Sequence, residues 1–192
     1  HPPLYPMNHA LFEELGKYVE LIVYCFGEHP RLHPNWLSSN YKKEAKNYEI
    51  RLLKKGISTF KNQFNFKAIY GLIKEKPDIV ISIAFWIPSL YSSILKYILN
   101  FKFIIVTDAI YETDKHISKL KFLMRKFICN NSDTIISASD LTTEYIKILN
   151  SKSIIKKSLQ TIDLKTWQLE FSKLPEKIIL KNFPELEQVV SR

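Results

Sequence analysis

The chain has 192 residues, of which 46% are hydrophobic and 24% charged, as is typical of a globular protein with a packed core. This length accommodates one α/β domain and excludes two of ordinary size. The net charge of +9 favours an acidic partner, such as nucleic acid, an anionic membrane or a phosphorylated substrate. Because the lysines are spread along the chain and form no nucleic-acid motif, a lysine-rich solvated surface explains the charge equally well.

The cysteines and the apolar runs indicate the compartment. Cys25 and Cys129 are too few for a disulfide framework or a zinc site, which favours the reducing cytoplasm. No apolar run approaches the roughly 18 to 20 residues that span a bilayer, and no signal-peptide pattern is present. We therefore expect a soluble or peripheral protein.

The first quarter of the chain predicts a helix, a strand and a loop. A helix begins near Asn8, with an apolar stripe of Ala10, Leu11, Leu15 and Tyr18, and a strand follows over residues 19–26. An α/β domain normally opens with a strand, so we expect the residues before His1 to supply it. Residues 28–39 form a loop, where His29 and His33 lack a third metal ligand, so we predict no metal site.

Helices are predicted for the next two segments. Residues 40–55 are charged and favour a helix that Gly56 ends. Phenylalanine and isoleucine spacing over residues 60–73 favours a second, amphipathic helix, which ends at Lys76-Pro77.

Three apolar runs, 79–83, 103–106 and 134–136, predict the central strands of a sheet buried on both faces. Helical segments separate them, one opened by Pro88 and one with Leu120, Leu123 and Phe127 among the residues at helical spacing. A helix over 141–149 and a strand over 154–157 follow. This alternation predicts a Rossmann-like α/β fold, with a mainly parallel sheet and helices on both faces.

Ligands of such sheets bind beyond the carboxyl ends of the strands. The polar and aromatic residues expected there are Thr107, Asp108, Tyr111, Ser137 and Ser139. Asp108 is the first acid after an otherwise apolar strand, where it would either serve chemistry or cap a turn. Ser139 is the natural N-cap of the next helix, although that helix end could also hold an anion.

Four segments in order resemble the N-terminal half of family-4 glycosyltransferases of the GT-B fold. They are KPDIVISIAFWIPSL, KFIIVTDAIYETD, RKFICNNSDTIISASDLTTEYI and SLQTIDLKTW. The resemblance covers residues 1–167 and implies an acceptor-side Rossmann-like domain, a single GT-B half. Residues 168–192 would then be a tail or helix left from the interdomain or C-terminal crossover segment. The chain departs from the family in its first loop, where Pro2-Pro3-Leu4-Tyr5-Pro6 replaces the usual glycine pair, and at Asp108, where the family often has histidine.

The resemblance implies a nucleotide-sugar-dependent, retaining hexosyltransferase of polysaccharide or glycoconjugate biosynthesis, inactive without a second domain. Asp108 would be catalytic, and Ser137 and Ser139 would contact an anion or the donor. Tyr5, Phe85, Trp86 and Tyr111 would bind the acceptor, although the same aromatic residues suit simple packing. The donor is a substrate, and neither cofactor nor metal is expected.

The expected partners are the nucleotide sugar, a sugar or lipid-linked acceptor, and an anionic surface at the inner face of the membrane, but no nucleic acid. Arg125 and Lys126 fit either a solvated helix face or a patch that faces this membrane. Two alternatives remain open: a stand-alone Rossmann-like nucleotide-binding or interaction module without catalysis, and a basic nucleic-acid binder.

Overall fold

The computed structural model describes residues 6–26, 38–53, 65–149 and 152–158, and every strand pair in them is parallel. The chain divides into two compact units, His1–Gln160 and Thr161–Arg192, and all described residues belong to the first. Its elements in chain order are α1 (Pro6–Leu15), β1 (Ile22–Phe26), α2 (Ser38–Glu44), β2 (Glu49–Leu53), α3 (Phe66–Glu75), β3 (Ile79–Ile83), α4 (Ile87–Leu99), β4 (Lys102–Thr107), α5 (Tyr111–Asp114), α6 (Lys119–Asn130), β5 (Thr134–Ser137), α7 (Asp140–Leu149) and β6 (Ile154–Lys157). The predicted α/β class with parallel strands is confirmed.

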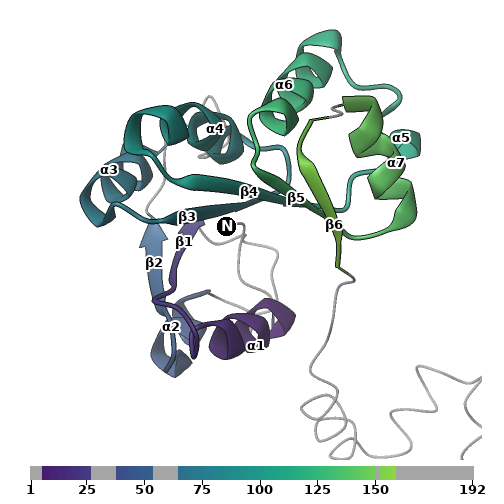
Figure 1. The fold of residues 1–192 in the computed structure, drawn as a ribbon. Helices are drawn as coiled ribbons and strands as arrows, with labels where there is room; N and C mark the ends of the chain where they lie inside the picture. The colour runs from purple at the N-terminus through teal and green to yellow at the C-terminus, as the bar shows by residue number, and fades with distance from the viewer. Residues whose placement is uncertain (1–5, 27–37, 54–64, 150–151, 159–192) are drawn as a thin grey trace, which may run out of the picture. The chain divides into compact units, whose positions relative to one another are not determined.

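The described strands form two sheets, one of β1 and β2 and one in the order β3-β4-β5-β6 (Figure 1). β4 and β5 are central in the larger sheet, as predicted. β3 lies at its edge, so its prediction as a central strand was wrong. Ile79 and Ile81 of β3 are about half exposed. Because side chains alternate along a strand, they lie on the face of the sheet opposite to Val80.

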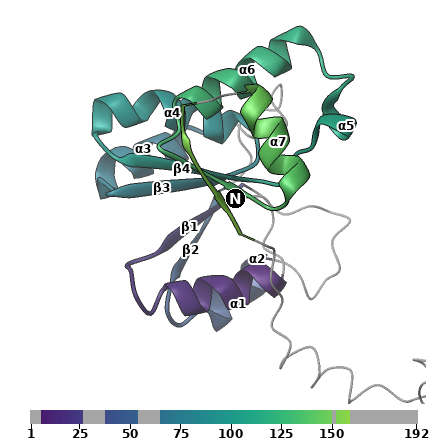
Figure 2. The same ribbon diagram turned by 45° about the vertical axis from the view of Figure 1, so that its right-hand side comes forward.

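The core of the larger sheet lies under three helices. Phe103, Ile105 and Ile135 are fully buried against α4, α6 and α7, and α6 and α7 lie side by side (Figure 2). The helices contribute the fully buried residues Ile128, Cys129, Ile146 and Leu149. Each buried aliphatic side chain stabilises the fold by about 1.5 to 3 kcal/mol. The apolar runs therefore form strands as predicted, but the expected burial on both faces is wrong: on the other face Ile79 and Ile81 are about half exposed, and Ile104 and Ile136 are only partly buried.

The smaller sheet packs against α1 and α2 and corrects two predictions. Ile50 and Leu53 are buried in β2, so residues 49–53 form a strand where a continued helix was predicted. The expected stripe of α1 is wrong in part, because Leu11 and, beyond the end of the helix, Tyr18 are exposed, whereas Ala10 and Leu15 are partly buried. Phe12, which the stripe did not include, packs against the core.

Helix α3 contacts the strands of both sheets. It begins at an N-cap, Asn65, whose side chain accepts the Lys67 N–H at 2.9 Å. Its buried face packs in one cluster with Leu53 of β2 and Val80 of β3. Gly71 is required because a Cβ there would collide with the Tyr24 ring.

Asp133 connects α4 to the start of β4. Its carboxylate accepts hydrogen bonds from Lys96 Nζ and from the Phe103 N–H, both at 2.7 Å. Burial alone would raise the pKa of Asp133, but these two hydrogen bonds outweigh it and leave the pKa below its usual value. Asp133 therefore stabilises the folded state most when it is ionised.

We expect Asp133→Ala to lower the free energy of unfolding by about 2 kcal/mol at pH 7, because Lys96 loses its charged partner. Since the folded pKa is depressed, this contribution is full above the unfolded pKa of about 3.9 and is lost as pH falls through the folded pKa. Urea denaturation of both proteins at pH 7 and in acid measures it. The exposed Glu112→Ala is the control, and an Asp133 effect that persists undiminished at low pH would contradict the assignment.

Candidate functional site

The strand register places the ends of β3, β4 and β5 at one edge of the sheet. Ile83 pairs with Val106, and Thr107 pairs with Ser137. The backbone hydrogen bonds continue one residue beyond β3 and β5. The Ala84 N–H donates to the Val106 carbonyl at 2.8 Å, and the Ala138 N–H donates to the Thr107 carbonyl at 3.1 Å. The segments after the three strands therefore begin side by side, where parallel sheets bind ligands.

A strained turn at Ala84 joins β3 to α4. Ala84 has φ 61°, a left-handed conformation that costs a residue with a side chain on the order of 1 to 2 kcal/mol. Ser89 Oγ holds this turn by donating to the Ala84 carbonyl at 2.5 Å. The turn leaves Trp86 41% exposed, while Phe85 packs partly buried against the core. Trp86 is thus available to a ligand, and Phe85 is mainly a packing residue.

Asp108 follows β4 and is exposed. Thr107 is buried, and its Oγ1 accepts the Ala109 N–H at 3.2 Å, so Thr107 rather than Asp108 closes this turn. Among the described residues, none forms a hydrogen bond or ion pair with the Asp108 carboxylate. Tyr111, at the start of α5, is half exposed and lies edge-on to Tyr145 with ring centroids 6.3 Å apart.

The two serines after β5 hold the backbone in place. Ser137 is fully buried and its Oγ lies 2.7 Å from Thr143 Oγ1, so its prediction as an anion or donor contact does not fit this geometry. Ser139 Oγ accepts the Thr142 N–H at 3.1 Å, which is the expected N-cap bond of α7. Ser139 is only partly buried and stays at the edge of the site.

Sequence reasoning missed a buried ion pair beside this edge. Arg125 of α6 pairs with Asp114 of α5, their side chains are 17% and 10% exposed, and the guanidinium lies 5.2 Å from the centre of the Phe85 ring. The expectation that Arg125 lies on a solvated or membrane-facing helix surface was therefore wrong. No local pattern could have found the pair, because eleven positions and a chain reversal separate the partners.

A small hollow of about 380 Å³ opens next to the ion pair. Its lining includes Tyr111, Asp114, Lys115, Phe122, Leu123 and Tyr145. The Tyr145 side chain is buried, and its hydroxyl has no hydrogen-bond partner within the described part of the chain. The spacing of Tyr145, Ile146 and Leu149 indicates the buried face of α7, but no sequence signal shows that this hydroxyl is unpaired. Aromatic walls with a few polar groups suit a small polar ligand.

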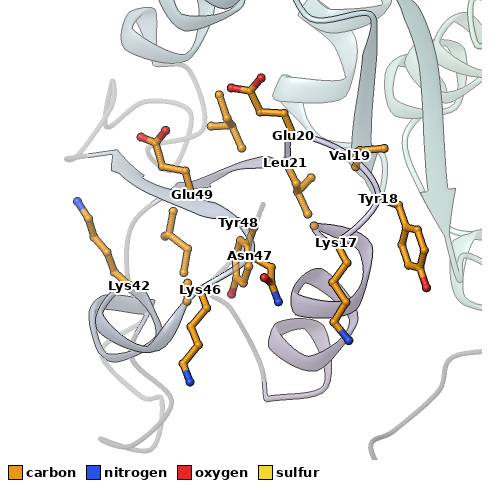
Figure 3. A pocket seen from close by; sticks show the side chains of 14 residues that line it. Lys17, Tyr18, Val19, Glu20, Leu21, Lys42, Lys46, Asn47, Tyr48 and Glu49 are labelled. Atoms are coloured by element: carbon orange, nitrogen blue, oxygen red, sulfur yellow. The ribbon is translucent and has the colours of Figure 1, made fainter.

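A wider hollow of about 710 Å³ lies at the opposite, amino ends of β1 and β2 (Figure 3). The side chains of Lys17, Lys42 and Lys46 border it but point in different directions, so they do not converge on an anion. Lys17 also pairs with Glu14 at 2.5 Å. We therefore place the candidate site at the carboxyl edge of the larger sheet.

Several predicted positions fall outside the described residues, namely Tyr5, His29 and His33. Within the described ranges, no group of three or more histidine, cysteine or acidic side chains is placed to hold a metal ion. Both cysteines are buried and form no disulfide with each other, and burial raises the pKa of the Cys129 thiol to about 12.

Comparison with models of protein families finds no match for this chain, and comparison with curated proteins finds none either.

We expect Asp114→Ala to lower the free energy of unfolding by about 3 kcal/mol, because it leaves the Arg125 guanidinium largely buried without a counter-charge. The double variant Asp114→Leu with Arg125→Met should recover most of this loss, since apolar residues of similar size can replace such a pair. Urea denaturation of the three proteins measures both effects. If the double variant were no more stable than the single one, the loss would not come from an unpaired charge.

Proposed function

We propose that this chain is the acceptor-binding domain of a nucleotide-sugar-dependent, retaining glycosyltransferase of the GT-B type. The observation that carries the proposal is an exposed carboxylate without a partner among the described residues, Asp108, at the carboxyl edge of a parallel sheet. Half-exposed aromatic rings accompany it after two neighbouring strands, Trp86 after β3 and Tyr111 after β4. The ordered resemblance of four segments to glycosyltransferases supports this assignment.

The chemistry of glycosyl transfer suits this arrangement. The transition state carries positive charge on the sugar ring, which a nearby carboxylate stabilises, and the acceptor hydroxyl must lose a proton. Asp108 can serve either purpose because no described residue neutralises it. The apolar faces of Trp86 and Tyr111 would pack against an acceptor sugar or glycolipid.

The donor would bind mainly to a second domain of the complete enzyme, as the resemblance implies. On this side, the N-terminus of α7 at Ser139 would contact an anionic phosphate, because Lys157 pairs at 2.8 Å with Asp140, the acid of its first turn. The reaction needs no metal in this proposal, and the enzyme would act in polysaccharide or glycoconjugate assembly in the cytoplasm. The alternative of a non-catalytic nucleotide-binding module uses the same edge, since parallel sheets often bind nucleotides there.

We expect Asp108→Asn in the complete protein to lower turnover roughly a hundredfold, as loss of a positioned acid–base group does. Its melting temperature should hardly change, because Asp108 makes no described contact. The measurement is release of the nucleoside diphosphate from a panel of nucleotide sugars in the presence of membranes from the source organism.

Glu112→Gln is the matched control, because Glu112 is an exposed acid on the neighbouring α5 that pairs with Lys115. Turnover should be unchanged in this variant. Nucleotide binding without any transfer would favour the non-catalytic module. Unchanged turnover in Asp108→Asn would remove Asp108 from the catalytic site.

A further inference from the structure

Three helices of the described unit present apolar side chains to solvent. The residues are Phe66, Tyr70 and Ile73 on α3, Ile94, Tyr97 and Ile98 on α4, and Leu120, Leu123 and Phe127 on α6, and they are between 43% and 77% exposed. We call these nine residues the outer helix face. Exposed apolar residues are ordinary singly, but large exposed apolar patches mark interaction surfaces, and these nine residues lie on three neighbouring helices.

The nine residues form stripes rather than scattered positions. Spacings of three and four residues place the members of each stripe on one side of their helix. The opposite sides of the same helices hold buried residues, such as Ala68 of α3, Ser92 of α4 and Cys129 of α6. The helices are also neighbours, because α4 packs with α3 in one hydrophobic cluster and contacts α6 directly (Figure 1). The outer helix face thus points away from the sheet.

The charges around these stripes have one sign. Exposed lysines accompany them, namely Lys67 and Lys74 on α3 and Lys119, Lys121 and Lys126 on α6. In these three helices the one carboxylate is Glu75, and Arg51 already occupies it at 2.7 Å. The outer helix face therefore offers apolar contact together with unopposed positive charge.

We propose that the outer helix face docks on the surface of an anionic lipid bilayer. Such a surface takes up apolar side chains at the acyl boundary and attracts lysines to its headgroups, at about 1 kcal/mol for each lysine. A second copy docked through the same face would place lysines against lysines. Nucleic acid would match the charge and could stack on the four aromatic residues of this face, but the other five are aliphatic and offer a base no ring, whereas a bilayer takes up both kinds of side chain.

The docking is peripheral in this proposal. None of the helices in the described ranges is both long and apolar enough to cross a membrane. The proposal does not depend on glycosyl transfer. It assigns the contact to α3, α4 and α6.

Co-sedimentation of the complete protein with vesicles tests the proposal, using phosphatidylcholine alone and phosphatidylcholine mixed with phosphatidylglycerol. We expect binding only to the mixed vesicles, weakened by salt. The variants Leu120→Ser with Leu123→Ser, and Lys119→Gln with Lys126→Gln, should each weaken binding roughly tenfold or more. All four positions are exposed, and circular dichroism verifies that the variants are folded.

The matched controls replace the same types of side chain, leucine and lysine, on other helices of the described unit. Leu11→Ser changes an exposed leucine on α1, and Lys42→Gln with Lys43→Gln removes two exposed lysines from α2. Both should bind mixed vesicles as the wild type does. The proposal would be overturned if the protein bound both kinds of vesicle equally or bound neither. It would also be overturned if the variants and the controls lost vesicle binding to the same extent. It would also be overturned if the α6 variants abolished self-association or binding to single-stranded RNA while the wild type ignored vesicles.

Discussion

The parallel register of β3, β4 and β5 is the constraint on which the rest of the structure depends. Because the three strands run in one direction and end at the same level, the chain must leave the sheet three times at one edge. Each exit uses a different device to turn the backbone: a left-handed alanine, a buried threonine and a serine N-cap. Because these residues close the turns, Trp86, Asp108 and Tyr111 are not needed for that purpose and stay exposed. The candidate site therefore lies at this edge.

The helices above this sheet have an inner side and an outer side with different residues. Their inner sides complete the core through Ile128, Cys129, Ile146 and Leu149. In α6 the apolar residues exceed what the core can bury, so Leu120, Leu123 and Phe127 stay exposed beside lysines. The Asp114–Arg125 pair fixes α6 to α5 close to the carboxyl edge. The same helix thus borders the candidate site and contributes to the proposed membrane surface.

The sequence predicted those elements whose pattern is local. Residues 79–83, 103–106 and 134–136 are continuous apolar runs, and each lies in a strand of the structure. β2 was missed because Glu49 and Arg51 interrupt its apolar residues and give it the composition of the charged segment before it. The apolar spacing predicted the helix α6, but spacing shows only which residues share a side and not whether the core covers that side. Asp108 and Trp86 could be placed at the edge from strand ends alone, whereas Asp114, Arg125 and Tyr145 meet only through tertiary packing.

The central claim is that ligands bind at the carboxyl edge of the larger sheet. Backbone NMR of the isotope-labelled protein, titrated with a panel of disaccharides and nucleoside diphosphates, tests it most directly. The account predicts that any probe that binds shifts the amide signals of residues 84–86, 108–111 and 138–139. Shifts confined to the hollow at the amino ends of β1 and β2, around Lys17 and Asn47, would contradict it.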